Sequence, residues 1–515
     1  MTSLPELPLE ILLQICALSK EKSYVSTVYI DLSKSTPAES KDRLSSLSNG
    51  DAPAIARAAK CLMINTIVAT NGADVVDALR EALNNFQGLE AVIWHMGEQD
   101  LDEIVLKALI TLPKLRELSL RTSSAQIAVP LDAFSHLQHL DIADDTENFS
   151  PDSPQGGTFE SLGELIAKTS ELSSVRVKRT GYGYESEGVN AAASLHQLFS
   201  RCSPEEPRVL QRLALHSMLV RINARTAPHL RHLVSLELTN IWEPRRSAPT
   251  SYSPFAWHPN KFLNSLNVEN DPDSAIKKVG STLEEIWTAI LAMDLKLEEI
   301  VVDTVCPALL KYLESYSGLK KLVLRRISSQ TAEASDELAT SFYGGPLRSH
   351  ADTLETLLIS AMFNGLWCFG EHNSDALTEL KSLKVFGMSL SPRWPAPGKY
   401  TNQDVIVMEF LEFATTSFPK LQILKVSFGR PEELRTNMFA AGDPRQFLAV
   451  QRAIAHGIGE FEEQHLSSPP TTNLPLEIHF VKKCWRPEYL CRETDSSGVG
   501  GWCLQETILD SEKYL

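Results

Sequence analysis

Residues 112–122 read LPKLRELSLRT, and the spacing of Leu115, Leu118 and Leu120 within them recurs through most of the chain. The repeated phrase is a leucine, two residues, an apolar residue, one residue and another apolar residue. It returns at Leu137-Leu140-Ile142, Leu172-Val175-Val177, Leu210-Leu213-Leu215, Leu233-Leu236-Leu238, Leu263-Leu266-Val268, Leu297-Ile300-Val302, Leu319-Leu322-Leu324, Leu354-Leu357-Ile359, Leu383-Phe386-Met388 and Leu421-Leu424-Val426, with looser copies at Ala59-Leu62-Ile64 and Leu89-Val92-Trp94. Units of this kind bury their apolar faces only by stacking on one another. The sequence therefore predicts a solenoid.

Helical patterns lie between the phrases, because apolar residues recur there at intervals of three and four. They cover residues 74–86, 159–169, 282–293 and 405–418. The repeating unit is thus predicted as strand, turn and helix, which gives an α/β solenoid with a parallel sheet on its concave face and helices outside, in the shape of a horseshoe. The phrases are 22 residues apart from Leu115 to Leu137 but 35 apart from Leu137 to Leu172, so we expect about 12 or 13 irregular repeats.

Three regions follow from this pattern. Residues 1–50 combine a short amphipathic helix with a polar linker, which we expect to be a loop or a weak helix, and residues 51–430 carry the solenoid. Residues 431–515 lose the phrase and show a helix-like stretch at 444–464 and a strand-like run at 476–483. We expect this last region to cap the open apolar end of the array.

The residue between the last two apolar positions of each phrase identifies a candidate binding surface. Successive side chains of a strand point to opposite faces, so Ser119 faces away from the core that Leu118 and Leu120 fill. In parallel strands these residues line one continuous concave face, the usual recognition face of such solenoids. The set is Ser119, Asp141, Arg176, Ala214, Glu237, Asn267, Val301, Val323, Leu358, Gly387 and Lys425, and we expect Ser119, Asp141, Arg176, Glu237, Asn267 and Lys425 to contact a protein partner.

Charge and composition exclude several partners. The 515 residues carry a formal net charge of −16 with no run of Lys and Arg that reverses it, so we expect no nucleic-acid partner. No apolar stretch approaches the roughly 20 residues that cross a bilayer, and we expect no membrane partner. The eight cysteines are scattered, as is typical of reduced thiols, and the first residues lack a signal-peptide pattern. A cytoplasmic or nuclear location is predicted.

The sequence contains no motif for catalysis or cofactor binding. There is no GxSxG elbow and no HExxH helix, and the glycines of GYGYESEG at 181–188 lack the order that cradles phosphate. His479, Cys484, Cys491 and Cys503 could ligate zinc, but they lack the close CxxC pair of structural sites. A lone histidine such as His136 or His229 is most simply a surface residue or a satisfied core residue. We expect no metal, no cofactor and no enzyme activity.

The phrases resemble leucine-rich repeats of the ribonuclease-inhibitor-like class. The segment Leu7-Pro8-Leu9-Glu10-Ile11-Leu12-Leu13-Gln14-Ile15 resembles the opening of an F-box, which begins with Leu-Pro, one residue and Glu, followed by apolar residues at helical spacing. Together with LRSHADTLETLLIS (347–360) and FPKLQILKVSFG (418–429), these features are similar to fungal F-box/leucine-rich-repeat proteins.

This resemblance implies a substrate-recognition adaptor of an SCF-type ubiquitin ligase. By resemblance, the F-box-like helix docks on a Skp1-like adaptor in a cullin complex, and the repeats hold a protein substrate whose identity stays unknown. The docking residues would be Leu7, Pro8, Ile11, Leu12 and Ile15. The alternative is a stand-alone leucine-rich-repeat scaffold without a ubiquitin link, in which the first helix only caps the first repeat.

Overall fold

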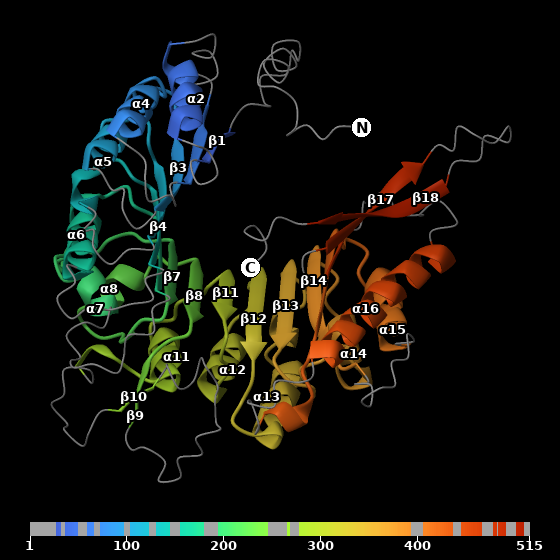
Figure 1. The fold of residues 1–515 in the computed structure, drawn as a ribbon. Helices are drawn as coiled ribbons and strands as arrows, with labels where there is room; N and C mark the ends of the chain where they lie inside the picture. Colours follow the sequence, from blue (N-terminus) through green and yellow to red (C-terminus); the bar gives the residue numbers. More distant parts are fainter. Residues whose placement is uncertain are drawn as a thin grey trace, which may run out of the picture. The chain divides into compact units, whose positions relative to one another are not determined.

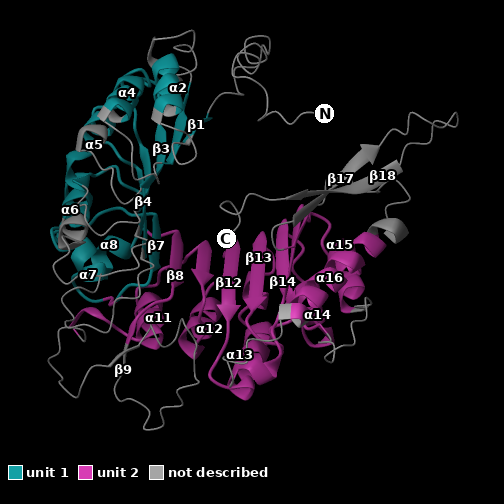
Figure 2. Cartoon of the chain, viewed as in Figure 1, with its two compact units in different colours: residues 1–219, 223–232 teal, residues 220–222, 233–515 magenta. Residues whose placement is uncertain are grey.

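The structure is a computed structural model of the chain and describes residues 27–31, 37–49, 59–65, 73–96, 103–122, 130–144, 155–179, 194–245, 265–267, 278–392, 405–435, 444–465, 477–480, 483–490 and 501–508. Two compact units divide the chain (Figure 2). Unit 1 comprises Met1–Leu219 and Asn223–His232, and unit 2 comprises Val220–Ile222 and Leu233–Leu515.

Unit 1 alternates strands with helices, and its strands pair in chain order (Figure 1). Every neighbouring pair from β1 to β7 is parallel. The elements are β1 (Thr27–Asp31), α2 (Pro37–Asn49), β2 (Cys61–Asn65), α4 (Ala73–Asn84), β3 (Ala91–Met96), α5 (Glu103–Ile110), β4 (Glu117–Thr122), η2 (Leu131–Ala133), β5 (His139–Asp144), α6 (Gln155–Lys168), β6 (Ser174–Arg179), α7 (Leu195–Leu198), β7 (Arg212–His216) and α8 (Ala227–Leu230).

Unit 2 repeats this plan from β8 to β16 and ends differently. Its strands pair in parallel in the order β8, β11, β12, β13, β14, β15 and β16, after which β17 and β18 add antiparallel. The elements are β8 (Ser235–Thr239), β9 (Glu243–Arg245), β10 (Ser265–Asn267), α11 (Leu283–Ala292), β11 (Glu299–Val302), α12 (Pro307–Glu314), β12 (Lys321–Ile327), α13 (Ala332–Gly344), η4 (Arg348–His350), β13 (Thr356–Ala361), α14 (Glu371–Thr378), β14 (Val385–Leu390), α15 (Val405–Ser417), β15 (Ile423–Phe428), η5 (Glu432–Leu434), α16 (Pro444–His465), β16 (Glu477–Phe480), β17 (Lys483–Leu490) and β18 (Gly501–Ile508).

The predicted fold class is confirmed: the chain is an α/β leucine-rich-repeat solenoid with parallel strands on one side of each unit and helices on the other (Figure 1). The phrase residues form the core, with Leu118 and Leu120 of β4 only 0% and 1% exposed. Burying one such leucine contributes about 2 kcal/mol. The four helices predicted between phrases correspond to α4, α6, α11 and α15.

Buried polar side chains connect successive repeats. In unit 2 the Tyr312 hydroxyl donates to the carbonyl of Leu295 at 2.8 Å and accepts the amide of Leu297 at 3.1 Å. Each unit also buries a histidine that accepts a backbone amide through Nδ1: His229 from Arg208 at 3.1 Å and His350 from Leu319 at 3.4 Å. Burial lowers the pKa of His229 and lowers that of His350 to about 4, so both rings are neutral core residues at pH 7.

The sheet begins before the expected repeat boundary at residue 51. Strand β1 pairs in parallel with β2, placing Tyr29 beside Met63, and Leu44 of α2 is buried. The segment expected as a polar linker therefore includes a strand and a helix of the repeat type. A second difference concerns the phrase at 263–268: its strand β10 pairs with β9 in a separate two-stranded sheet.

Candidate functional site

The candidate site is the strand face that points away from the helices, here called the helix-distal face of each unit. It is formed by the residues that alternate with the core positions. In unit 1 the central row across β1 to β7 consists of Tyr29, Met63, Ile93, Ser119, Asp141, Arg176 and Ala214. In unit 2 the corresponding row across β8 and β11 to β16 consists of Glu237, Val301, Val323, Leu358, Gly387, Lys425 and His479.

In unit 1 the central row changes from apolar to charged along the sheet. Tyr29 is 58% exposed, and Met63 and Ile93 beside it are partly exposed. Farther along, Arg176 Nη1 lies 3.9 Å from Asp141 Oδ2, with both side chains well exposed. An exposed pair of this kind contributes little to stability. Asp141 and Arg176 therefore lie on the exposed face and take no part in the packed core.

In unit 2 part of the central row is buried by neighbouring side chains of the same face. Val301 and Val323 are each only 6% exposed, although they were predicted to face solvent. Arg325 Nη1 of β12 lies 3.0 Å from Glu237 Oε1 of β8, and β11 runs between these two strands. The ion pair therefore crosses β11 and covers Val301. The prediction that both valines are exposed is wrong, and the ion pair across β11 accounts for the burial of Val301.

Asp303 follows β11 beside this ion pair. Its carboxylate accepts the amide of Asn240 at 2.7 Å. Burial raises the pKa of Asp303 to about 6, and Arg325 opposes that rise. The group therefore ionises near neutral pH.

Strand β12 contains a bulge at the same place. The register between β12 and β13 shifts between Leu324 and Ile327, and Arg326 has a φ of 49°. A positive φ is uncommon for a residue with a side chain, and bulges re-aim the side chains of a strand. Arg325 and Arg326 are successive basic residues at this bend, at the carboxyl end of the strand.

Gly387 lets the side chains of the two neighbouring strands approach each other. A Cβ at this position would lie 2.8 Å from both Leu358 Cδ2 and Lys425 Cβ. The Lys425 ammonium has a lowered pKa because it is partly buried and because Arg325 and Lys321 carry like charge nearby. On this part of the face Leu358 and Lys425 pack closely over Gly387, and Lys425, Arg325 and Lys321 bring three positive charges near one another.

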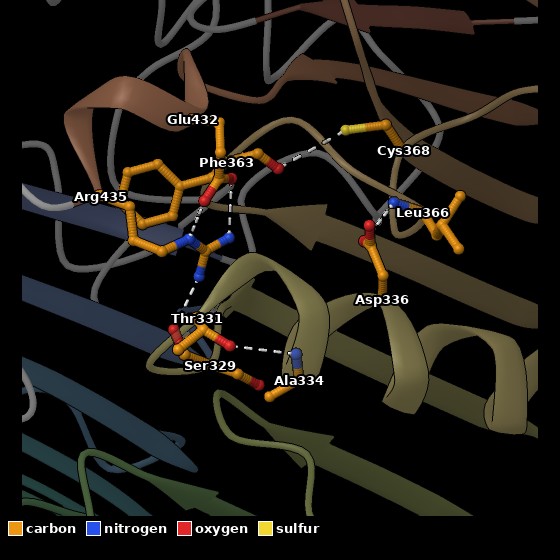
Figure 3. A network of polar contacts seen from close by, with 9 residues as sticks. All are labelled: Ser329, Thr331, Ala334, Asp336, Phe363, Leu366, Cys368, Glu432 and Arg435. Carbon is orange, nitrogen blue, oxygen red and sulfur yellow. Dashed lines mark hydrogen bonds and ion pairs between the residues drawn. The ribbon is translucent and has the colours of Figure 1, made fainter.

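The loops after the strands of unit 2 are tied together by a network of polar contacts around Arg435 (Figure 3). Arg435 forms an ion pair with Glu432, and its Nη1 donates to the carbonyl of Ser329 at 2.7 Å. The guanidinium lies 4.5 Å from the ring centre of Phe363. Because these residues follow β12, β13 and β15, the network fixes the carboxyl edge of three strands.

A second set of contacts in Figure 3 holds the adjoining turn. Asp336 Oδ1 accepts the amide of Leu366 at 2.8 Å, and the Cys368 thiol lies 3.8 Å from the carbonyl of Phe363. The Thr331 hydroxyl caps α13 by accepting the amide of Ala334. Burial raises the pKa of Cys368 and of Cys306 to about 12, so neither thiol is a nucleophile at neutral pH.

The structure places five of the six predicted partner-contacting residues on the helix-distal faces: Ser119, Asp141, Arg176, Glu237 and Lys425. The expected place of Asn267 on this sheet is wrong. Strands β8 and β11 pair directly and satisfy each other's backbone groups, so β10 lies in its own sheet with β9. Whether any of these residues contacts a partner stays a prediction.

The predicted Skp1-binding residues Leu7, Pro8, Ile11, Leu12 and Ile15 lie outside the described residues.

Within the described ranges, no group of three or more His, Cys, Asp or Glu side chains could hold a metal ion. His479 lies opposite Cys484 in the β16–β17 pair, whereas Cys503 lies opposite Glu488. In the same ranges, no helix has the length and apolar character needed to span a bilayer.

Sequence reasoning missed the Glu237–Arg325 pair, the buried carboxyl of Asp303 and the bulge of β12. The partners of the ion pair are 88 positions apart, and no local pattern joins them. One signal was available for the bulge: the phrase of β12 is followed at once by two arginines, which interrupt the alternation of apolar and polar residues.

Comparison with protein-family models and with curated proteins finds no match. Among solved structures, the chain is similar to an internalin, InlF, from Listeria monocytogenes, with 12% identity, a TM-score of 0.27, and coverage of 81% of this chain and 92% of that chain. It is also similar to the yeast structure of a complex of Rad7 and Elc1, with 10% identity, a TM-score of 0.32, and coverage of 76% and 83%.

Proposed function

We propose that this chain is a non-enzymatic scaffold that recognises a protein through the helix-distal faces of its repeats. The observation that supports this most is the row of Ser119, Asp141 and Arg176. These residues stand in register on adjacent strands, are at least partly exposed, and take no place in the core. A rigid parallel sheet presents such residues as a preorganised surface, which lowers the entropic cost of binding.

The more specific proposal is a substrate-recognition adaptor of an SCF-type ubiquitin ligase. It is supported by the F-box-like segment, in which Leu7, Pro8, Ile11, Leu12 and Ile15 would dock on a Skp1-like adaptor of a cullin complex. The repeats would then position the substrate, while the transfer chemistry belongs to partner subunits. A cytoplasmic or nuclear location fits this role.

One observation favours the alternative of a stand-alone scaffold. An F-box spans about three helices, but the chain after the first segment forms β1 and α2, and β1 joins the repeat sheet beside β2. Residues 27–49 therefore belong to a repeat unit and do not form the second and third helices of an F-box. In this version residues 4–18 cap the first repeat and no Skp1 is bound.

Co-purification with Skp1 separates the two proposals. The full chain and a version lacking residues 1–20 are each co-expressed with Skp1 and captured through a C-terminal tag. Retention by the full chain and loss on deletion supports the ligase adaptor. Retention by neither leaves the scaffold, and retention by both would contradict the docking residues.

Leu12→Asp is the matched point variant, because it places a charge on the proposed docking surface. The adaptor version expects loss of Skp1 with an unchanged melting temperature. The capping version expects a lowered melting temperature instead, measured by thermal denaturation of the same samples.

A further inference from the structure

The helix-distal face of unit 1 is basic between β4 and β7, although the whole chain is acidic. Among the described residues at its twelve alternate positions, four are cations and two are carboxylates. The cations are Arg121, Arg176, Lys178 and Arg212, the carboxylates are Glu117 and Asp141, and the remaining positions include His139 and His216. This local excess of positive charge contrasts with the net charge of −16.

No sequence run reveals this patch, because the fold assembles its cations from three strands, β4, β6 and β7. Arg121 of β4, Ala143 of β5, Lys178 of β6 and His216 of β7 form one row in register. Arg176 belongs to the central row, and Arg212 to the row on its amino-terminal side. All four cationic residues are at least partly exposed, and the Arg176 side chain is 55% exposed.

The spacing of these cations fits an extended acidic segment. Adjacent strands are about 4.8 Å apart, and alternate residues on one strand are about 6.6 Å apart. Carboxylates on alternate residues of an extended peptide are also about 6.6 Å apart. A segment that crosses the strands therefore passes Arg176 and Lys178 together on β6 and then Arg212 on β7, so its acidic residues meet three cations.

The same face is apolar at its other end. Tyr29, Met63 and Ile93 form the central row on β1, β2 and β3, immediately before Ser119 of β4. Six strand spacings separate β1 from β7, which is about 29 Å and corresponds to about nine residues of extended chain. A segment lying across the strands would place apolar residues at β1–β3 and acidic residues at β6–β7.

We infer that the helix-distal face of unit 1 binds an extended protein segment of about nine residues, apolar at one end and acidic at the other. This inference rests on the proposed function and adds the chemistry of the partner. A nucleic acid fits less well, because Glu117 and Asp141 stand among the cations and the net charge of the chain repels a long polyanion. The apolar row also has no counterpart in a phosphate backbone.

The test measures binding of fluorescein-labelled probes to the full chain by fluorescence anisotropy. The first probe is a twelve-residue peptide with two leucines and a phenylalanine at one end and five Asp and Glu residues at the other. The second probe replaces the acidic residues by lysine, and the third is a twelve-nucleotide oligouridylate. The inference expects the acidic peptide to bind most tightly, and its affinity to fall as salt rises.

Charge reversal locates the site. Arg176→Glu combined with Lys178→Glu should weaken binding of the acidic peptide at least tenfold. The matched control reverses the same number of charges on the helix side, with Lys107→Glu in α5 and Lys168→Glu in α6, and should change the affinity less than twofold. Thermal denaturation of both variants verifies folding, and Arg212→Glu is the substitute if the double variant fails to fold.

Equal weakening by the two double variants would overturn the inference, because the peptide would then sense only net charge. Tighter binding of the oligouridylate than of the acidic peptide would assign the patch to nucleic acid. Absence of binding by the acidic peptide would also overturn it. None of these results bears on Skp1 co-purification, so failure of this inference and failure of the proposed function are distinguishable.

Discussion

The helix-distal faces of the two units share one backbone plan and use it differently. In unit 1 the central row contains Ser119 and Asp141, which are partly exposed, and Arg176, whose side chain is 55% exposed. In unit 2 the row contains Val301 and Val323, each 6% exposed, and the Glu237–Arg325 pair crosses the strand that carries Val301. The phrase leucines form the helix-facing core in both units, whereas the residues between them are exposed in unit 1, where we propose that they serve recognition, and include buried valines in unit 2. Seven substitutions in four experiments test this difference.

The largest effect is expected at the core positions that both units share. Leu120→Asp in unit 1 and Leu324→Asp in unit 2 each place a carboxylate where the leucine is 1% exposed. Each should lower the free energy of unfolding by more than about 4 kcal/mol. Chemical denaturation measures it. A mild effect in either unit would contradict the assignment of that strand.

Substitutions in the central row should change the stability of the chain by different amounts in the two units. Val323→Asp should destabilise the chain by about 3 kcal/mol because the valine is buried, whereas Ser119→Asp at the equivalent position of unit 1 should change the stability by less than about 0.5 kcal/mol. The measurement is the same denaturation experiment. Equal losses would mean that the two faces do not differ as described.

The pH dependence of stability should reveal the buried carboxyl of Asp303. Its pKa is raised from 3.8 to about 6 on folding, so the folded state binds the proton more tightly than the unfolded state. Stability from this group is present below pH 3.8 and is lost as the pH rises through 6. The loss amounts to at most about 3 kcal/mol.

Asp303→Asn keeps an oxygen acceptor for the Asn240 amide and cannot ionise. Melting temperatures of both proteins between pH 4 and pH 8 should therefore diverge, with the variant more stable than the wild type above pH 6. Parallel curves would show that Asp303 is already ionised without cost in the folded protein.

The smallest effect is expected at Gly387. A methyl group there meets Leu358 and Lys425 at 2.8 Å, so Gly387→Ala should cost about 1 kcal/mol. Gly459→Ala in α16 is the matched control, because no atom beyond the neighbouring backbone of its own helix lies within 4 Å of its Cβ position. Alanine in a helix should stabilise by about 0.5 to 1 kcal/mol. If both substitutions changed the free energy of unfolding in the same direction, the close packing of Leu358 and Lys425 over Gly387 would be contradicted.

Local pattern predicts a large part of this fold. The alternation that buries Leu118 and Leu120 also places Ser119 on the opposite face, because it depends only on the strand geometry. The same reasoning places Asp141, Arg176, Glu237 and Lys425. The helices between the phrases follow from a different local pattern, the recurrence of apolar residues at intervals of three and four.

Long-range pairing explains what could not be predicted. The phrase at 263–268 matches the repeat, but the pairing of β8 with β11 excludes its strand from the main sheet. Val301 is buried because Glu237 and Arg325 pair across it over 88 positions. The basic patch of unit 1 combines Arg121, Lys178 and Arg212, which the sequence distributes over three strands.

The central claim is that a protein partner binds the helix-distal face and not the helices. The most direct measurement is photo-crosslinking in cells with p-benzoylphenylalanine at Ser119 on β4, or at Lys168 on α6 as the control, with mass spectrometry of the adducts. The account predicts a defined protein adduct from position 119 and none from position 168. The same adduct from position 168 alone, or at equal yield from both positions, would contradict it.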